Sequence, residues 1–439
     1  MKVLKFGGTS VGSAQRMKEV AKLITDGEQK IVVLSAMSGT TNTLVEISDY
    51  LYKKNPEGAN EIINRLEAKY KQHVNELYST DEYKQKTQEF IKAQFDYIRS
   101  YTKDIFTLFE EKVILAQGEL ISTNMVTNYL QEQGVNAILL PALEFMRTDK
   151  NSEPDPVYIK EKLAAQLEIH PDAEIYITQG FICRNAYGEI DNLQRGGSDY
   201  TASLIGAAVN ASEIQIWTDI DGMHDNDPRI VDKTSPVRHL HFEEAAELAY
   251  FGAKILHPTC VQPAKYANIP VRLLNTMEPT APGTLISNET EKCIIKAVAA
   301  KDNITAIKIK SSRMLLAHGF LRKVFEIFES YQTSIDMICT SEVGVSVSID
   351  NTKHLNEILD DLKKYGTVTV DQDMCIICVV GDLEWENVGF EAKALDAMRD
   401  IPVRMISFGG SNYNISFLIR EEDKKKALQS LSDHLFNNK

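Results

Sequence analysis

The chain opens with the stretch MKVLKFGGTSVGS (residues 1–13), in which a lysine stands one residue before a Phe-Gly-Gly-Thr-Ser turn. The common phosphate loop, G-x-x-x-x-G-K-[ST], has its lysine after the glycines instead. Here Lys5 lies on a predicted strand, and Gly7 and Gly8 would let the backbone approach phosphate oxygens closely. A helix that begins near Ser13 would point its amides at an anion, and Lys5 would add a full positive charge. The alternative is a tight turn beside a surface lysine.

Strands and helices alternate through the first half of the chain. Residues 30–37 (KIVVLSAM) are typical of a buried strand, and residues 56–133 indicate several long amphipathic helices. Helical spacing relates a set of apolar residues after the first turn: Ala14, Met17, Val20, Ala21 and Ile24. The alternation predicts an α/β fold with a mainly parallel sheet, helices on both faces and ligands at the carboxyl ends of the strands.

The sequence changes near Thr280, where turn residues accumulate and shorter elements follow. Beyond it, the stretch VGVSVSI places Val343, Val345, Val347 and Ile349 at a period of two, which predicts a strand with one apolar face. One βαββαβ unit of ferredoxin-like pattern is complete, and a second lacks its last strand, which residues 293–300 can supply. We therefore expect a first domain at 1–288 and a second region at 289–439. In that region, one unit (about 305–372) would be inserted in the other (about 293–304 plus 373–439).

Composition limits the function classes. The 439 residues are 43% hydrophobic and 25% charged, as in packed globular proteins, and the net charge is −14. Such a surface repels nucleic acid and anionic membranes. No apolar run approaches the length of about 20 residues that spans a membrane, and the start does not resemble a signal peptide. Six scattered cysteines favour a reducing, cytoplasmic location.

Cys375 and Cys378 have C-x-x-C spacing, which a redox or zinc site would use. No second pair and no histidine stand nearby. We favour a buried strand, in which residues three apart point to opposite faces.

A second Gly-Gly turn follows Arg195 in the stretch LQRGGSDYTASLIGAAV. A guanidinium can bind a carboxylate in bidentate fashion. Ser198 and the amides of the helix that it opens can bind an anion, and Asp199 can hold an amine. The alternative is that Ser198 is the N-cap of that helix.

Three further features are weaker when each is taken alone. The aspartate-rich stretch WTDIDGMHDNDPRI does not fit a calcium loop, because Met223 and His224 occupy the fifth and sixth positions from Asp219. A nucleotide-binding strand end fits it better. Lys254 could reach phosphates or could be a solvated lysine, and Glu119 could simply be a helix-dipole partner.

Together, the blocks KFGGTSV, VVLSAMSGTTN, QGELIST, RGGSDYTA, WTDIDG…DPRI and FGAKILHP resemble the aspartokinase signature in order and spacing. The resemblance spans the whole chain, including two C-terminal ACT-type units, and is strongest to the single-function, lysine-sensitive type. It implies an amino-acid-kinase-type αβα sandwich followed by a pair of ACT units. It also implies transfer of the γ-phosphoryl of MgATP to the side-chain carboxylate of L-aspartate, the first step towards lysine, threonine and methionine.

Matching positions imply the site residues. The catalytic set is Lys5, Asp199 and Lys254. The ATP set is Lys5, Gly7, Gly8, Thr9, Ser10, Ser35, Thr218, Asp219, His224, Arg229, Lys254 and Ile255. The aspartate set is Thr41, Glu119, Arg195, Ser198 and Asp199, with Arg195 on a carboxylate and Glu119 or Asp199 facing the amine. Mg²⁺ would be held chiefly by ATP phosphates rather than by a protein cage. The lysine-sensitive relatives place a tyrosine where this chain has His224.

The ACT units imply an effector site and a homodimer that forms through them. The matching effector residues are Met314, Phe320, Leu321, Ser334, Ile335, Asp336, Thr340, Ser341 and Glu342. Asp336 and Glu342 could face the side-chain amine of lysine, which a threonine effector would not require. The alternative is a turn with surface acids, and Ala317 stands where those relatives have a serine.

Two other functions stay open. One is a kinase that acts on another small amino acid, although such relatives usually lack the RGGSDYTA block. The other is a catalytically silent amino-acid sensor, which would lose Lys5, Arg195 or Lys254; all three are present.

Overall fold

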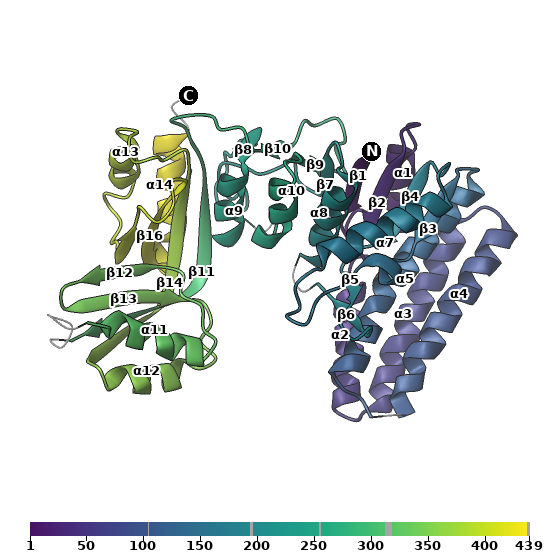
Figure 1. Ribbon diagram of the computed structural model, residues 1–439, viewed down its shortest axis with the longest axis horizontal. Helices are drawn as coiled ribbons and strands as arrows, with labels where there is room; N and C mark the ends of the chain where they lie inside the picture. The colour runs from purple at the N-terminus through teal and green to yellow at the C-terminus, as the bar shows by residue number, and fades with distance from the viewer. Residues whose placement is uncertain (104, 194–195, 254–255, 312–317, 437–439) are drawn as a thin grey trace. The chain divides into compact units, whose positions relative to one another are not determined.

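The computed structural model describes residues 1–103, 105–193, 196–253, 256–311 and 318–436 (Figure 1). The chain forms two compact units. The first unit contains Met1–Met223 and Ile255–Asn288, and the second contains His224–Lys254 and Glu289–Lys439. None of the described helices has the length and apolar character needed to cross a membrane.

A mainly parallel sheet forms the centre of the first unit. Its strands lie in the order β3 (Ala137–Leu140), β4 (Ile175–Gln179), β2 (Lys30–Leu34), β1 (Lys2–Phe6), β7 (Ile214–Thr218), β9 (Val271–Asn275) and β10 (Thr284–Ser287). All neighbours are parallel except β10, which runs antiparallel to β9. Every residue of β2 and β4 is buried, as expected for strands that helices cover on both faces.

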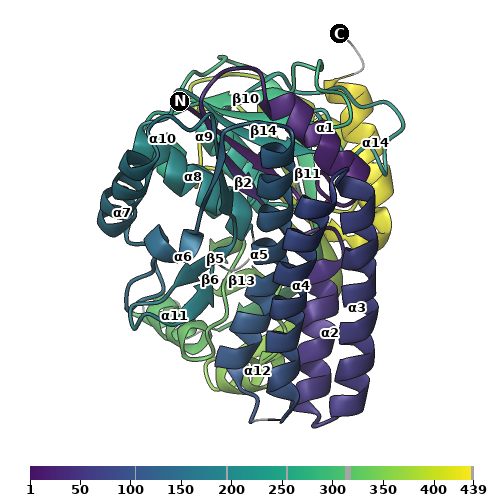
Figure 2. The same cartoon turned by 90° about the vertical axis from the view of Figure 1, so that its right-hand side faces the viewer.

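Helices cover both faces of this sheet. One face carries α1 (Ala14–Ile24), α2 (Thr40–Tyr52), α3 (Pro56–Leu77), α4 (Asp81–Ser100) and α5 (Leu108–Glu132), which share one apolar core with Leu4 and Phe6. Helices α2 to α5 run side by side (Figure 2). The other face carries α8 (Gly197–Val209), which contacts β1, β2 and β7. Lys5 alternates with Leu4 and Phe6 and so points towards α8.

Short elements complete the first unit. They are η1 (Tyr101–Lys103), α6 (Ala142–Phe145), α7 (Pro156–Ile169), the hairpin β5 (Ile182–Arg184) and β6 (Ile190–Asn192), η2 (Pro258–Val261) and α10 (Gln262–Tyr266). Both α7 and α10 pack against α8.

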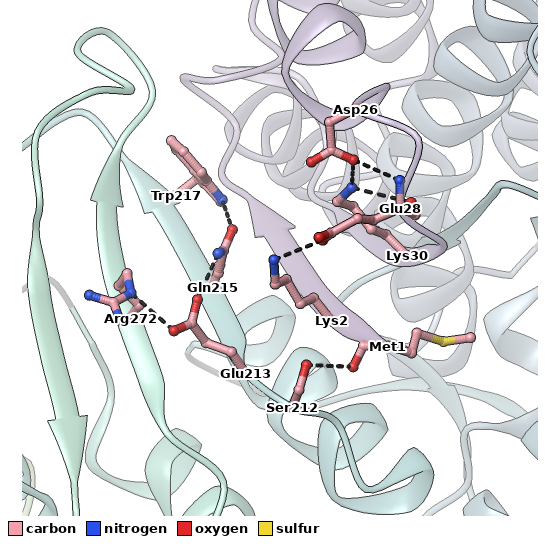
Figure 3. A network of polar contacts seen from close by, with 10 residues as sticks. All are labelled: Met1, Lys2, Asp26, Glu28, Lys30, Ser212, Glu213, Gln215, Trp217 and Arg272. Atoms are coloured by element: carbon pink, nitrogen blue, oxygen red, sulfur yellow. Dashed lines mark hydrogen bonds and ion pairs between the residues drawn. The ribbon is translucent and has the colours of Figure 1, made fainter.

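Polar contacts fix the amino ends of the parallel strands (Figure 3). Lys2 pairs with Glu28 at 2.8 Å, and Lys30 pairs with Asp26. At the neighbouring strands, Arg272 donates to Glu213 at 3.0 Å. The cavity described below lies at the carboxyl ends of these strands. The contacts at the amino ends lie at the opposite edge of the sheet and therefore belong to the scaffold.

An antiparallel sheet forms the centre of the second unit. Its strands lie in the order β12 (Ile338–Ser341), β13 (Gly344–Ile349), β11 (Ile295–Lys310), β14 (Thr367–Gly381), β16 (Asn414–Arg420) and β15 (Met405–Ser407). Two apolar cores lie against it. One contains α11 (Phe320–Ser330) and α12 (Leu355–Lys363), and the other contains α13 (Phe390–Ala397) and α14 (Lys424–Leu435), which follows η4 (Glu421–Asp423). We call them the α11–α12 half and the α13–α14 half.

The two long strands β11 and β14 are shared by both halves (Figure 1). Residues 306–310 of β11 pair with residues 367–371 of β14, and residues 295–301 pair with residues 376–381. The register shifts between the two stretches, at Lys301–Ala306. This pairing is the one that the nested domain boundaries require; the boundaries themselves stay a proposal.

The second unit also contains the segment with β8 (His239–His241) and α9 (Phe242–Tyr250). Glu244 and Lys296 form a buried ion pair at 3.1 Å, and the Glu247 side chain accepts a hydrogen bond from Asn414. Asn226 donates to the Leu428 carbonyl at 2.9 Å. These contacts hold residues 224–253 against the antiparallel sheet.

The periodicity of the sequence is confirmed in three places. The five apolar residues predicted on one face of α1 are its buried residues. Val345, Val347 and Ile349 point into the core of the α11–α12 half, whereas Val343 precedes β13 and is 37% exposed. Cys375 and Cys378 are buried in β14 as free thiols, and burial raises the pKa of each.

Candidate active site

A cavity of about 420 Å³ lies at the carboxyl ends of β1, β2 and β4. Ligands collect at this edge of open α/β sheets, as the sequence predicts. Its described lining residues are Lys5, Gly8, Ser35, Ala36, Met37, Ser38, Gly39, Thr41, Asn42, Glu119, Phe181, Gly196, Gly197, Ser198 and Asp199. The cavity thus brings together residues from four of the blocks singled out above.

The turn after β1 packs tightly on the turn after β2. A Cβ atom at Gly8 would lie 2.8 Å from the carbonyl oxygen of Ala36, closer than real Cβ contacts. The Ser38 amide donates to the Gly8 carbonyl at 3.1 Å. Gly8 is therefore needed for the close approach of two backbone turns, both of which line the cavity.

Lys5 and Asp199 form an ion pair inside the cavity. The Nζ atom of Lys5 lies 2.7 Å from Oδ1 of Asp199, and their side chains are only 11% and 12% exposed. Lys5 comes from the end of β1 and Asp199 from the first turn of α8. The pair gives the cavity one fixed cation that is held in place before any ligand binds.

Ser198 also faces the cavity, where it accepts a hydrogen bond from the Ser35 hydroxyl at 3.0 Å. The N-cap of α8 is Gly196, in a left-handed conformation with φ 71°, and Ser198 is the second helical residue. The alternative of Ser198 as N-cap is therefore wrong. Its hydroxyl is available for the cavity because the N-cap position lies two residues earlier, at Gly196.

Glu119 is a buried carboxyl group of the central helix α5. Its Oε1 accepts a hydrogen bond from the Ala36 amide at 3.1 Å, and its Oε2 has no hydrogen-bond partner among the described residues. Burial raises the pKa of Glu119 to about 8, although the Ala36 amide acts in the opposite direction. Because Glu119 lines the cavity, its unpaired oxygen is placed to meet a positively charged group.

Two contacts that support the cavity were not predicted from the sequence, although Ser122 lies in the QGELIST block. The Ser122 hydroxyl, one turn after Glu119, donates to the Ser35 carbonyl at 2.8 Å. Tyr70, fully buried on α3, hydrogen-bonds Thr40 at 2.9 Å at the start of α2. The two contacts fix the two ends of the turn between β2 and α2: Ser122 of α5 holds Ser35, and Tyr70 of α3 holds Thr40.

The helix termini at the cavity differ from the expectation. The helix after the first Gly-Gly turn is α1, whose N-cap Ser13 accepts from the Arg16 amide at 3.3 Å. None of the described lining residues belongs to α1; the starts of α2 and α8 line the cavity instead. The turn at Gly7 and Gly8 contributes close packing and Lys5 rather than a helix amino terminus.

The predicted ATP residues are distributed over both units. Thr218 is the last residue of β7, the neighbour of β1, and Asp219 follows it. Ser10 is buried and hydrogen-bonds Thr276 at 2.7 Å. In the second unit, Nδ1 of His224 lies 2.8 Å from the Thr234 hydroxyl, and Arg229 binds Asp227 with two nitrogens at 2.9 and 2.7 Å. Gly7, Thr9 and these residues are not among the described lining residues of the cavity.

Four predicted site residues lie outside the described residues: Arg195, Lys254, Ile255 and Met314. The convergence of Lys5 with Arg195 stays a prediction. The described neighbours of Arg195 in the same block, Gly196 to Asp199, do line the cavity with Lys5.

The predicted effector residues fall at the α11–α12 half. Phe320 is buried in its core, and Ile335 packs against that core. Leu321 and Glu342 are exposed, and the Ser341 hydroxyl reaches the Gly344 carbonyl at 3.5 Å. Asp336 is a buried carboxylate, paired with Lys301 at 2.8 Å, so it is not a surface acid.

Comparison with known proteins agrees with this architecture. Residues 1–275 match the model of the amino acid kinase family, and residues 377–435 match an ACT domain model. The chain is 35% identical to chloroplastic aspartokinase 1 of Arabidopsis thaliana, over 99% of this chain and 80% of the relative. It is 32% identical to lysine-sensitive aspartokinase 3 of Escherichia coli, over 99% of both chains.

Solved structures give the same result. The crystal structure of E. coli aspartokinase III with aspartate and ADP (R-state) matches with a TM-score of 0.87 and 32% identity, over 99% of this chain and 100% of that chain. The same enzyme with lysine and aspartate (T-state) matches with a TM-score of 0.80, over 99% of each chain. The fold is thus that of an amino acid kinase that carries ACT domains. Within that class, the chain belongs to the aspartokinase family.

Proposed function

We propose that this aspartokinase transfers the γ-phosphoryl group of ATP to the side-chain carboxylate of L-aspartate, giving 4-phospho-L-aspartate and ADP. The observation that carries the proposal is one cavity lined by both a held cation, Lys5, and a carboxyl group with an unpaired oxygen, Glu119. The E. coli relative binds aspartate and ADP.

Catalysis would rest on positioning and on charge neutralisation. A carboxylate acceptor is already ionised at neutral pH, so no strong general base is required. The bond from γ-phosphorus to the bridging oxygen breaks as a carboxylate oxygen of aspartate attacks in line. Lys5 would stabilise the negative charge on the transferring phosphoryl group, and Asp199 would hold Lys5 in place at 2.7 Å until phosphate oxygens replace it.

Recognition of aspartate would use both signs of charge. The α-amine would bind the unpaired oxygen of Glu119, and the ammonium would favour ionisation of this buried carboxyl group. Thr41, Ser198 and the start of α8 would contact carboxylate oxygens, together with Arg195. Glutamate is one methylene longer, so its side-chain carboxylate would be displaced from the line of attack.

ATP would bind with Mg²⁺, whose oxygen ligands come chiefly from the phosphates. The supporting residues would be those of the turns at Gly7–Ser10 and Ser35, Thr218 and Asp219 at the carboxyl end of β7, and His224, Arg229, Lys254 and Ile255. When bound, Mg²⁺ would neutralise phosphate charge, and Lys5 would supply the protein's own share of that neutralisation.

Regulation would act through the ACT part of the chain. We propose lysine as a feedback inhibitor at Asp336 and its neighbours, since the E. coli relative binds lysine in its T-state. A homodimer through the ACT units and a cytoplasmic location are part of the same proposal, with no nucleic acid or membrane partner.

The decisive experiment is a coupled assay of ADP release with purified enzyme, ATP and Mg²⁺. Release should require L-aspartate, should be at least about tenfold slower with L-glutamate or N-acetylglutamate, and should fall when L-lysine is added. Equal rates with glutamate would favour a kinase of another amino acid. Absence of any acceptor-dependent release would favour the silent sensor.

A further inference from the structure

Asp336 is a buried carboxylate whose two oxygens differ in their surroundings. Its side chain is 0% exposed. Oδ1 accepts hydrogen bonds from Lys301 Nζ and from the Tyr250 hydroxyl, each at 2.8 Å. Oδ2 is buried and has no hydrogen-bond partner in the part of the chain that the structure describes. A buried carboxylate oxygen without a donor is costly, so this oxygen is a candidate ligand-binding atom.

The charges around Asp336 do not balance. Lys301 Nζ also lies 2.9 Å from Oδ2 of Asp350, so one ammonium faces two carboxylates. Burial holds the pKa of Asp336 above its usual range, although Lys301 and Tyr250 act in the opposite direction. One further positive charge at Oδ2 would balance the group, whereas a neutral ligand would leave it negative.

Tyr250 connects this group to α9. It is the last residue of that helix, and its ring centroid lies 4.4 Å from Lys301 Nζ. Two residues later, a Cβ atom at Gly252 (φ 114°) would lie 2.1 Å from the Ala300 carbonyl oxygen, so only glycine fits there. This close approach places the end of α9 directly beside β11, one residue before Lys301. Any movement of Asp336 or Lys301 would therefore reach α9.

The same helix is fixed at its other end to the α13–α14 half, through Glu244 with Lys296 at 3.1 Å and through Glu247 with Asn414. Helix α9 thus contacts both halves of the antiparallel sheet, and its C-terminal contact is the one that includes Asp336. Residue Lys254, assigned to ATP by resemblance, follows Tyr250 by only four positions.

We propose that the Tyr250 hydroxyl, which donates to Oδ1 of Asp336, transmits the binding of an effector amine at Oδ2 of the same carboxylate to α9. The proposal rests on the proposed inhibition by lysine and on its site at Asp336, and it assigns three further residues to that inhibition. Lys301 and Asp350 set the requirement for a positive charge, and Tyr250 couples the bound amine to the segment that precedes Lys254.

The requirement for charge is tested by isothermal titration calorimetry of the full-length enzyme with L-lysine and with L-norleucine, which lacks the side-chain amine. Lysine should bind at least about tenfold more tightly, because norleucine leaves the buried oxygen unpaired. Asp350→Asn removes one excess negative charge and should weaken lysine binding by about threefold or more. Equal binding of the two ligands, or unchanged affinity in Asp350→Asn, would overturn the charge argument.

The coupling is tested with Tyr250→Phe, which deletes only the hydroxyl and keeps the ring beside Lys301. Half-inhibition is measured against the uninhibited rate of the same variant. The lysine concentration that gives half-inhibition should be at least about fivefold higher in Tyr250→Phe than in the wild type. The dissociation constant for lysine, measured by calorimetry, should change by less than this. The matched control is Tyr331→Phe, which deletes a hydroxyl that donates to Asp361 at 2.9 Å between α11 and α12. Its inhibition should equal that of the wild type.

The outcomes separate this inference from the proposed function. If the wild-type enzyme neither binds lysine nor is inhibited by it, the proposed regulation fails, and the inference fails with it. If the wild type is inhibited and Tyr250→Phe is inhibited equally, the inference alone fails. Should Tyr250→Phe unfold at assay temperature, Tyr250→Trp provides a second variant that lacks the hydroxyl, with the same two outcomes.

Discussion

The Ala36 amide donates to Oε1 of Glu119 at 3.1 Å, while Oε2 of the same carboxyl group is buried without a partner among the described residues. The carboxyl group is therefore oriented by one oxygen and presented to the cavity by the other. Burial raises its pKa to about 8. In the free enzyme, most Glu119 side chains are then protonated at neutral pH, whereas an ammonium ligand requires the ionised form.

This linkage predicts a pH-dependent KM for aspartate. Below pH 8, binding of the amine must remove a proton from Glu119, so KM should fall as pH rises from 6.5 towards 8, by up to about tenfold per unit. Initial rates over this range, at saturating ATP, measure the effect. Glu119→Gln should raise KM and flatten its pH profile. A profile in Glu119→Gln as steep as in the wild type would assign the proton to another group.

A second prediction concerns Ser122, which donates to the Ser35 carbonyl at 2.8 Å. Ser122→Ala leaves that carbonyl unpaired and loosens the turn that carries Ser35, so KM for aspartate should rise about three- to tenfold. The control is Ser48→Ala, another buried serine, whose hydroxyl bonds only the Leu44 carbonyl of its own helix among the described residues. A role limited to stability would lower the active fraction in both variants and leave both KM values unchanged.

A third prediction concerns the stability of the second unit. The side chains of Lys296 and Glu244 are 2% and 0% exposed, and Lys296 also donates to the His239 carbonyl at 3.0 Å. Lys296→Met leaves the buried carboxyl group without its cation and should lower the free energy of unfolding by about 3–5 kcal/mol. Urea denaturation measures it. Adding Glu244→Gln should recover part of the loss; if the double variant is no more stable than Lys296→Met, the two residues are not coupled.

The sequence predicted the elements whose pattern is local. The apolar face of α1, the alternation in β13 and the buried strand with Cys375 and Cys378 depend on spacing within one element, and all are present. The two Gly-Gly turns were also informative, because a turn that brings Lys5 beside Asp199 needs backbone approaches that only glycine allows.

Contacts between distant segments could not be predicted. Ser122 and Ser35 are separated by 87 positions, and Tyr70 and Thr40 by 30. Ser35, Thr40 and Ser122 stand in the blocks singled out above, but spacing within a block does not show which residue of another segment each one contacts. The resemblance predicts that Asp336 faces an effector, but its pairing with Lys301 and Tyr250 depends on the shared strand β11 and on Gly252. Helix starts were misplaced for a related reason: Gly196 takes a left-handed conformation, which moved the N-cap of α8 before Ser198.

The central claim, that Lys5 acts on the transferring phosphoryl group within the cavity that holds aspartate, is tested most directly by the turnover of Lys5→Ala. Steady-state rates of ADP release at saturating ATP and aspartate should fall at least about 10²-fold. A loss of this size is typical when one group that stabilises the charge of the transition state is removed. Circular dichroism should show an unchanged fold, since Lys5 is one residue of a strand that both neighbours hold. A turnover within about threefold of the wild type would contradict the account.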